Sequence, residues 1–237
     1  MNIIVTGASQ GIGYELVKDF CRQLKSGKII AISRNAQKLE QLKNECSVIN
    51  SSVAIVSVAA DISSVKLSQT HSALFQSEMP HVDILINNAG LLIKKNFSDL
   101  SEEDIYRAYN VNVFSLFRLL KILKHQMGGE KQTHIVNISS MGGFQGSAKF
   151  SGLSAYSSSK GAAAVLTECL AEEFKNDNIK VNCLALGAAQ TKMLEEAFPG
   201  YKAPLTAAQM ATFISNFALT GSSFFNGKIL PVSLSTP

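Results

Sequence analysis

Tyr156 and Lys160 stand four residues apart in a segment whose pattern predicts a helix. Residues at that spacing share one helix face, so the lysine ammonium can lie within several Å of the tyrosine hydroxyl. An adjacent cation favours phenolate and lowers the pKa of tyrosine from about 10 toward neutral pH. The pair therefore predicts a general acid or base, although two solvated side chains on an ordinary helix would show the same spacing.

A glycine-rich segment follows the first apolar run of the chain. Its glycines, Gly7, Gly11 and Gly13, allow a tight turn and a close approach of the backbone to a ligand. A helix is expected to begin directly afterwards, so its free amides can hold a pyrophosphate. The general G-x-G-x-x-G fingerprint is not met, because Leu16 stands at its third glycine position. An ordinary strand-to-helix turn stays open as the alternative.

Polar residues follow two later apolar runs as well. Asn87-Asn88-Ala89-Gly90 comes after one of them, and Ser139-Ser140 comes after the other. In parallel sheets, ligands bind beyond the carboxyl ends of the strands, so we expect these residues to lie beside the glycine-rich segment. Adjacent asparagines by themselves are equally typical of a capped turn.

These residues need a scaffold, and the hydrophobic pattern predicts one. Short β-branched apolar runs are expected to be strands, at residues 3–5, 28–32, 53–58, 84–86, 134–138, 179–184 and 228–232. Amphipathic helices are expected between them, at residues 11–25, 35–46, 63–78, 101–127, 154–176 and 206–219. Ser101 with Asp104, and Thr206 with Gln209, predict reciprocal caps at two helix starts. The alternation predicts an α/β fold: a doubly wound parallel sheet of about seven strands with helices on both faces.

The chain has 237 residues and a mass of 25.5 kDa, which favours one domain over residues 1–237. Hydrophobic residues make up 46% and charged residues 17%, a composition that excludes the disordered, collagen-like and disulfide-scaffold classes. The net charge of +4 is scattered along the chain, so no nucleic-acid partner is expected.

Signals for metal, membrane and secretion are absent from the sequence. The four cysteines and four histidines lack metal-ligand spacing, so no metal is expected. The uncharged stretch 203–227 contains Pro204 and polar residues at helical spacing, which argues against a membrane span. The amino terminus lacks a basic and apolar leader, so we expect a cytoplasmic location.

The motifs Thr6-Gly7-x-x-x-Gly11-x-Gly13, Asn87-Asn88-Ala89-Gly90, Ser140 and Tyr156-x-x-x-Lys160 occur in an order that resembles the short-chain dehydrogenase/reductase family. The resemblance covers essentially the whole chain and implies a Rossmann-type oxidoreductase that transfers hydride between NAD(P) and a small carbonyl or alcohol. Tyr156 would be the acid or base, and Lys160 would lower its pKa and bind the nicotinamide ribose. Ser140, with Ser139 as the alternative, would hold the substrate oxygen. Asn112 would connect Lys160 to solvent through a water.

The resemblance also implies a dinucleotide site, whose contacts would be Gly7, Ser9, Gln10, Gly11, Ile12, Gly13, Ser33, Arg34, Asp61, Ile62, Asn88, Ala89, Gly90, Tyr156, Lys160, Gly187 and Thr191. This chain departs from the family in the interval of 16 residues from Ser140 to Tyr156, which is longer than usual, and in Leu186-Gly187, where the family has Pro-Gly. The substrate lid, at about residues 192–205, must be short. Apolar residues in these loops suit an apolar or mixed substrate: Phe144, Phe150, Leu153, Met193, Phe198 and Tyr201.

Cofactor choice depends on the end of the second predicted strand. NAD-selective sites of this fold place Asp or Glu about 20 residues past the glycine loop, to bind the ribose 2′-hydroxyl. This chain has Ser33 and Arg34 there. A hydroxyl beside a guanidinium binds a 2′-phosphate, so NADP(H) is expected, and NAD(H) is possible but less preferred. Gln10, where many NADP-preferring relatives carry a basic residue, predicts moderate discrimination.

Two other functions compete with this one. A cofactor-binding regulator or scaffold would not need Ser140, Tyr156, Lys160 and Asn112 together. A sugar-nucleotide epimerase or dehydratase also uses Tyr and Lys, but the residues after 191 are too few for its larger C-terminal domain. The resemblance implies a homodimer or homotetramer, in which helices 104–127 and 154–176 would pair across two-fold axes. The small residues 161–164 would allow close helix approach, and helix 104–127 offers more apolar residues than one sheet face needs: Val111, Leu116, Leu119, Leu120 and Leu123.

Overall fold

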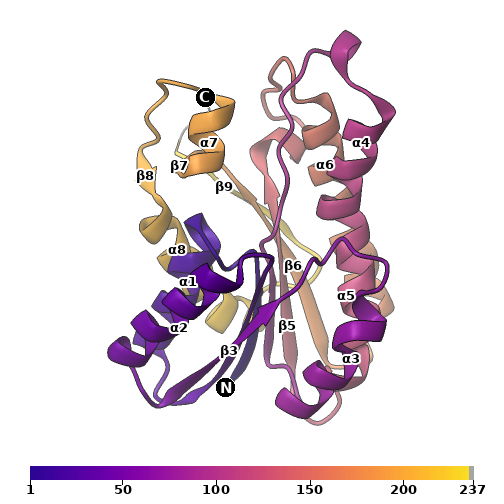
Figure 1. The fold of residues 1–237 in the computed structure, drawn as a ribbon. Coiled ribbons are helices and arrows are strands. Elements are labelled where there is room, and N and C mark those ends of the chain that lie inside the picture. Colours follow the sequence, from indigo (N-terminus) through magenta and orange to yellow (C-terminus); the bar gives the residue numbers. More distant parts are fainter. Residues whose placement is uncertain (235–237) are drawn as a thin grey trace.

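The computed structural model describes residues 1–234, so the last three residues of the predicted domain lie outside it. Its centre is a parallel seven-stranded sheet in the order β3-β2-β1-β4-β5-β6-β9 (Figure 1). The strands are β1 (Asn2–Thr6), β2 (Gly27–Ser33), β3 (Val53–Ala59), β4 (Ile84–Asn87), β5 (Thr133–Ser140), β6 (Ile179–Leu186) and β9 (Ile229–Val232). The predicted doubly wound α/β fold is confirmed.

Helices cover both faces of this sheet (Figure 1). One face carries α1 (Gly11–Gln23), α2 (Ala36–Ile49) and α8 (Ala207–Thr220). The other face carries α3 (Leu67–Glu78), α5 (Ser115–Leu123) and α6 (Ser154–Glu173), and α4 (Glu102–Tyr109) precedes α5 and packs on α6. Among residues 1–234, every helix is too short or too polar to cross a membrane.

Strand β1 shows why the apolar runs are continuous. Ile3 and Val5 pack with Phe20 of α1 in the core on one face, whereas Ile4 packs in the core on the other. Successive side chains of a strand point to opposite faces, so a sheet covered on both sides needs apolar residues at every position.

The predicted helix 101–127 is helical from Glu102 to Gln126, but it is not α-helical throughout. Helix α4 runs into a π-helical turn at Asn110–Phe114, then into α5, and ends in a 3-10 turn at Lys124–Gln126. The wider turn accommodates Asn112, whose buried side chain bonds to the backbone of Leu91 rather than facing solvent. The predicted helix 63–78 begins only at Leu67, because Asp61 accepts hydrogen bonds from Ser63 and closes a turn before it.

Both predicted reciprocal caps are present, Ser101 with Asp104 at α4 and Thr206 with Gln209 at α8. Two further elements follow β6 and were not predicted, because each is too short for a periodic pattern. They are α7 (Lys192–Ala197) and a two-stranded pairing of β7 (Ala189–Gln190) with β8 (Leu205–Thr206).

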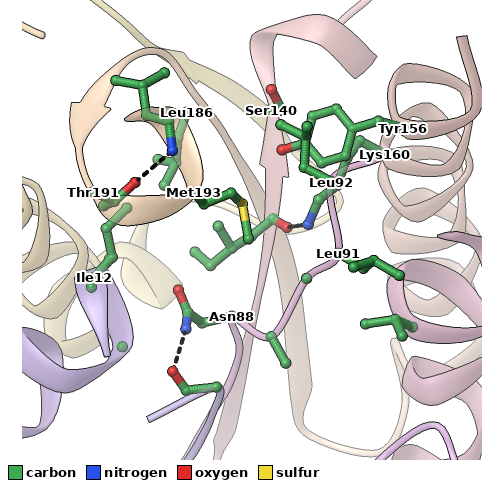
Figure 2. A pocket seen from close by; sticks show the side chains of 18 of the residues that line it. Ile12, Asn88, Leu91, Leu92, Ser140, Tyr156, Lys160, Leu186, Thr191 and Met193 are labelled. Atoms are coloured by element: carbon green, nitrogen blue, oxygen red, sulfur yellow. Dashed lines mark hydrogen bonds between the residues drawn. The ribbon is translucent and has the colours of Figure 1, made fainter. Parts of the chain in front are cut away.

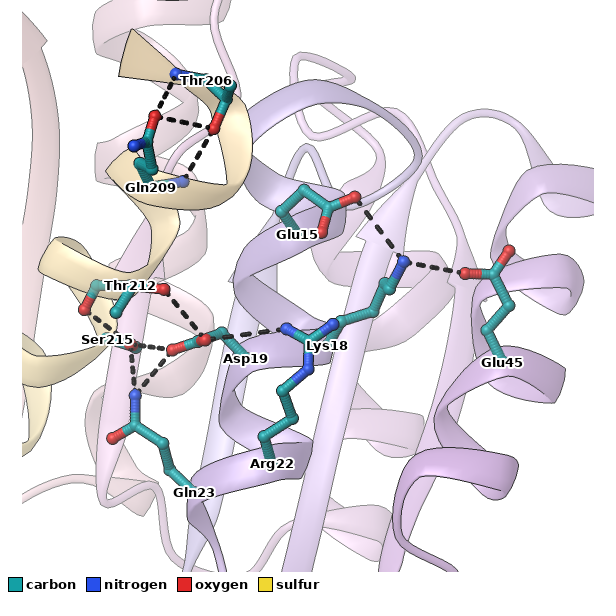
Figure 3. Close-up of polar contacts among 10 residues, drawn as sticks. All are labelled: Glu15, Lys18, Asp19, Arg22, Gln23, Glu45, Thr206, Gln209, Thr212 and Ser215. Atoms are coloured by element: carbon teal, nitrogen blue, oxygen red, sulfur yellow. Dashed lines mark hydrogen bonds and ion pairs between the residues drawn. The ribbon is translucent and has the colours of Figure 1, made fainter.

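Helix α8 is tied to α1 by a polar network around the buried carboxylate of Asp19 (Figure 3). Asp19 accepts hydrogen bonds from Ser215, from Thr212 at 3.1 Å and from Gln23 at 2.6 Å, and it pairs with Arg22 at 3.7 Å. The network joins the helix after the glycine-rich loop to the last helix of the chain.

Candidate active site

A cleft of about 530 Å³ opens beyond the carboxyl ends of the strands. Ser140 and every residue predicted to contact the dinucleotide line it, from Gly7 to Thr191. Asn112 does not line it. The fold therefore brings together loops that follow β1, β2, β3, β4, β5 and β6. Within residues 1–234, no three His, Cys, Asp or Glu side chains gather as a metal site requires.

The glycine-rich loop has the geometry of a cradle. Gly7 and Gly11 have φ of +70° and +58°, a region that favours glycine. A Cβ on Gly13 would lie 2.3 Å from the Gly7 carbonyl oxygen, so the loop closes this tightly only with glycine there. Helix α1 then begins without a side-chain cap and without an acidic residue in its first turn. Its free N–H groups and its dipole therefore suit an anionic group in the cleft.

Asn88 holds this cradle against the loop after β4. Its side-chain amide donates to the carbonyl oxygens of Thr6 at 2.9 Å and Gly7 at 3.4 Å. One hydrogen bond from the Asn88 amide is drawn in Figure 2. The hydroxyl of Thr6 in turn accepts the backbone N–H groups of Asn88 and Ala89, both at 3.0 Å. Asn88 thus lines the cleft and also fixes the two loops relative to each other.

Ser140, Tyr156 and Lys160 lie together on one wall of the cleft (Figure 2). Tyr156 and Lys160 stand one turn apart on α6, and Ser140 ends β5 beside them. The Ser140 hydroxyl hydrogen-bonds to Tyr156 and accepts the Gly142 N–H at 3.2 Å. The Ser139 hydroxyl is buried and donates to the Lys160 carbonyl oxygen at 2.8 Å. Of the two serines, Ser140 is therefore the one beside the tyrosine.

The predicted lowering of the tyrosine pKa is wrong for this structure. Burial raises the pKa of Tyr156, and only its hydrogen bond with Ser140 works in the opposite direction. The Lys160 ammonium donates to the Ile138 carbonyl oxygen at 2.8 Å (Figure 2). Burial lowers the pKa of Lys160 to about 8. Helical spacing places the two residues on one face of α6, but the ammonium points to the Ile138 carbonyl oxygen of β5.

Asn112 lies behind this wall and supports it. Its side chain accepts the Leu91 N–H at 2.8 Å and donates to the Leu91 carbonyl oxygen and the Ser159 hydroxyl, both at 2.9 Å. Ser159 donates to the Tyr156 carbonyl oxygen at 2.8 Å, which ties Asn112 to the helix turn that carries the tyrosine. Ser159 was not predicted, because a serine between Tyr156 and Lys160 has no distinctive spacing of its own.

The end of β2 forms a polar recess that continues the cleft. Ser33 donates to the Ser9 hydroxyl at 2.6 Å, and Arg34 is exposed beside them. Lys38 of α2 also lines the recess and donates to the Gln10 side chain at 3.4 Å. The recess contains no carboxylate. Lys38 was not predicted, because Arg34 lies before the start of α2 and helical spacing does not relate the two residues.

The opposite end of the cleft is apolar. It is lined by Leu91, Leu92, Met141, Phe150, Leu153, Met193 and Phe198, whereas Phe144 and Tyr201 from the predicted set do not line it. Lys94 contacts the end of α7: its ammonium donates to the Ala197 carbonyl oxygen at 2.7 Å and lies 4.3 Å from the Phe198 ring centre. Phe198 packs edge-on against Phe150 at 5.8 Å.

Known proteins share this sequence and this architecture. Residues 1–202 match the family described as short chain dehydrogenase. The 3-oxoacyl-(acyl-carrier-protein) reductase of Chlamydia trachomatis is 30% identical over 240 residues, which cover 97% of this chain and 94% of that protein. L-sorbose reductase from Gluconobacter frateurii, complexed with NADPH and L-sorbose, has the same fold, with a TM-score of 0.86 at 21% identity over 98% of this chain and 94% of that one.

A third relative was solved with the other nicotinamide cofactor. The 3-ketoacyl-(acyl-carrier-protein) reductase of Brucella melitensis, complexed with NADH, has a TM-score of 0.82 at 25% identity over 98% of this chain and 96% of that one. The family match over residues 1–202 and the full-length relative together show that this chain belongs to the short-chain dehydrogenase family, oxidoreductases that use NAD(P)H with carbonyl or alcohol substrates.

Proposed function

We propose that this protein is an NADP(H)-dependent reductase of small carbonyl compounds, with Tyr156 as the proton donor. The observation that carries the proposal is the cluster of Ser140, Tyr156 and Lys160 at a cleft whose other end is a glycine cradle. A bound dinucleotide supplies the hydride. The uncapped start of α1 would hold its pyrophosphate, and Thr191 and Gly187 would contact its nicotinamide end.

The chain's own residues then handle the proton. The raised pKa of Tyr156 keeps its phenol protonated at neutral pH, which suits a donor to a carbonyl oxygen. Ser140 would hold that oxygen beside the phenol. Lys160 would return a proton from solvent, because a pKa of about 8 lets it exchange protons near working pH. Substitution of Tyr156 by Phe tests this assignment, because it removes the proton donor alone.

The recess at the end of β2 supports NADP(H) over NAD(H). Arg34 and Lys38 place two cations beside the hydroxyls of Ser9 and Ser33, and charge-assisted hydrogen bonds from such a set favour a phosphate over a hydroxyl. The test is kcat/KM with NADPH and with NADH for the parent, Arg34→Ala and Lys38→Ala. Lys43→Ala, an exposed position on the same helix, is the matched control. A parent that prefers NADH, or a preference unchanged in both variants, would refute the assignment.

The two competing functions find less support. A scaffold that only binds a dinucleotide does not need the full set of Ser140, Tyr156, Lys160 and Asn112. The described residues after Thr191 form α7, β8, α8 and β9, and β9 completes the main sheet rather than a second domain. A single domain over the whole chain, a lid at residues 192–205 and a cytoplasmic location stay predictions.

We propose that α4, α5 and α6 also form an interface between copies of this chain. Leu116, Leu119, Leu120 and Leu123, expected to face a partner, are buried in the chain's own core, because α5 turns them toward the sheet. The exposed apolar side chains on these helices and on the π-helical turn between α4 and α5 are instead Ile105, Tyr106, Phe114, Phe117 and Val165. Light scattering at micromolar concentration is expected to give a dimer or tetramer, and Phe117→Asp a smaller species. A monomeric parent would contradict the proposal.

A further inference from the structure

The loop between β5 and α6 has a residue of the proposed reaction centre at each end. Ser140 is the last residue of β5, and Tyr156 lies in the first turn of α6. Within this interval, which is long for the family, Phe150 lines the cleft. Leu153 donates its N–H to the Phe150 carbonyl oxygen at 3.3 Å and accepts the Ser157 N–H at 2.7 Å. These two bonds tie Phe150 to the first turn of the helix that carries the tyrosine.

Phe150 contacts a ring from a second segment of the cleft. Phe198 directly follows α7 and also lines the cleft. The two ring centres lie 5.8 Å apart with the planes at 75°, a favourable edge-to-face arrangement, and both side chains are half-buried. One ring comes from the loop after β5 and the other from the segment after β6, so the pair joins two segments that line the cleft.

A third segment, the loop after β4, holds this pair in place. The Lys94 ammonium lies 4.3 Å from the Phe198 ring centre and donates to the Ala197 carbonyl oxygen at 2.7 Å. Lys95 donates its backbone N–H at 3.0 Å to the carbonyl oxygen of Gly152, in the loop between β5 and α6. Three loops therefore converge on the two rings, and displacing either ring breaks contacts between them.

This arrangement has a consequence for a substrate with a hydrocarbon chain. The apolar lining of the cleft would bind such a chain, since each buried methylene contributes about fourfold to affinity. A chain long enough to reach the joined rings gains nothing further, because crowding a packed contact is unfavourable.

We propose that the pair of Phe150 and Phe198 limits the length of the substrate, so that the protein reduces short carbonyl compounds in preference to their longer homologues. This inference rests on the proposed carbonyl reduction and names two specificity-determining residues for it. Removal of either ring is expected to lengthen the chain that the cleft accepts.

The first experiment measures turnover of 2-butanone, 2-hexanone and 2-octanone with NADPH. In the parent, kcat/KM for 2-octanone is expected to be no higher than for 2-butanone. Phe198→Ala and Phe150→Ala are each expected to raise the ratio of the 2-octanone value to the 2-butanone value by about tenfold or more. Phe97→Ala, which removes an 82% exposed ring outside the cleft, is the matched control and should keep the parental ratio.

Three results would overturn the length limit. The first is a ratio unchanged in both cleft variants. The second is a parent whose kcat/KM rises about fourfold with every methylene up to 2-octanone. The third is an equal gain for all three ketones in the variants, which would show that the rings control entry to the cleft rather than chain length.

The second experiment measures binding without turnover, so that the two proposals can fail separately. The protein saturated with NADP⁺ is titrated by calorimetry with butanamide and with octanamide, unreactive carbonyl compounds of two lengths. At least about tenfold tighter binding of octanamide in Phe198→Ala, absent from the parent and from Phe97→Ala, supports the length limit even if no ketone is turned over. The same preference in the parent would overturn the limit while leaving carbonyl reduction intact.

Discussion

Replacing Lys160 by methionine is expected to make the protein more stable while it abolishes turnover. The Lys160 side chain is 4% exposed, and burial lowers its pKa from the ordinary 10.5 to about 8. At about 1.4 kcal/mol for each pH unit, keeping this lysine charged in the folded protein costs about 3 kcal/mol at neutral pH. Methionine fills nearly the same volume and carries no charge.

Part of that gain is offset by a lost hydrogen bond. Lys160 donates to the Ile138 carbonyl oxygen at 2.8 Å, and leaving that acceptor unpaired costs about 1–2 kcal/mol. The net expectation for Lys160→Met is a free energy of unfolding about 1–2 kcal/mol higher at pH 7. The lysine is retained for its chemistry, at a cost in stability that is common for functional sites.

The pH dependence of this difference has a defined sign. Between pH 8 and pH 10.5 the folded protein has released the Lys160 proton while the unfolded chain still binds it. The unfolded state then holds more protons, so the stability of the parent rises with pH over that window. Lys160→Met lacks this titration, and its advantage is therefore expected to disappear by about pH 9.5.

Urea denaturation at pH 7 and pH 9.5 checks this, at one fixed protein concentration because the proposed assembly would contribute to stability. Lys121→Met, at an exposed position of α5, is the control and should match the parent at both pH values. A Lys160→Met protein that is less stable than the parent at pH 7, or an advantage of the same size at both pH values, would refute the reasoning.

Three further substitutions test the site. Tyr156→Phe is expected to lower turnover by about 10²-fold or more with nearly unchanged NADPH affinity in fluorescence titration, because it removes only the proton donor, and near-normal turnover would exclude that role. Gly13→Ala places a methyl group 2.3 Å from the Gly7 carbonyl oxygen, so calorimetry should show at least about tenfold weaker NADPH binding, and parental affinity would contradict the cradle geometry. Lys94→Met removes the hydrogen bond to Ala197 and the contact with the Phe198 ring, so amide hydrogen exchange of residues 191–198 should become faster. In the control Lys149→Met, whose lysine bonds lie within residues 144–147, the exchange of residues 191–198 should not change. An unchanged exchange rate in Lys94→Met would show that Lys94 does not hold this segment.

The strands and the loops that follow them could be predicted because each depends on local pattern. A run such as Ile29 to Ile32 is apolar at every position, and the polar or glycine residues after such runs necessarily meet at one edge of a parallel sheet. This is why the residues predicted to contact the dinucleotide all line the cleft. Helix boundaries were accurate where a cap such as Ser101 or Thr206 marked them.

What could not be predicted depends on contacts between distant segments. Periodicity places Leu116 and Leu119 on the apolar face of a helix, but it does not show whether that face packs on the chain's own sheet or on a partner chain. The π-helical turn at Asn112 depends on a hydrogen bond between the Asn112 side chain and the backbone of Leu91. The direction of the Lys160 ammonium depends on its hydrogen bond to the Ile138 carbonyl oxygen. Lys94 and Lys38 have no motif of their own, and only the folded chain shows what surrounds them.

The polar network around Asp19 also bears on the order in which the protein is made. Its carboxylate emerges from the ribosome early, but Thr212 and Ser215 follow 193 and 196 residues later. Until then a charge destined for the interior has only Gln23 and Arg22 of its own helix as partners. The helix that follows the glycine cradle therefore reaches its final environment only after α8 has been synthesised.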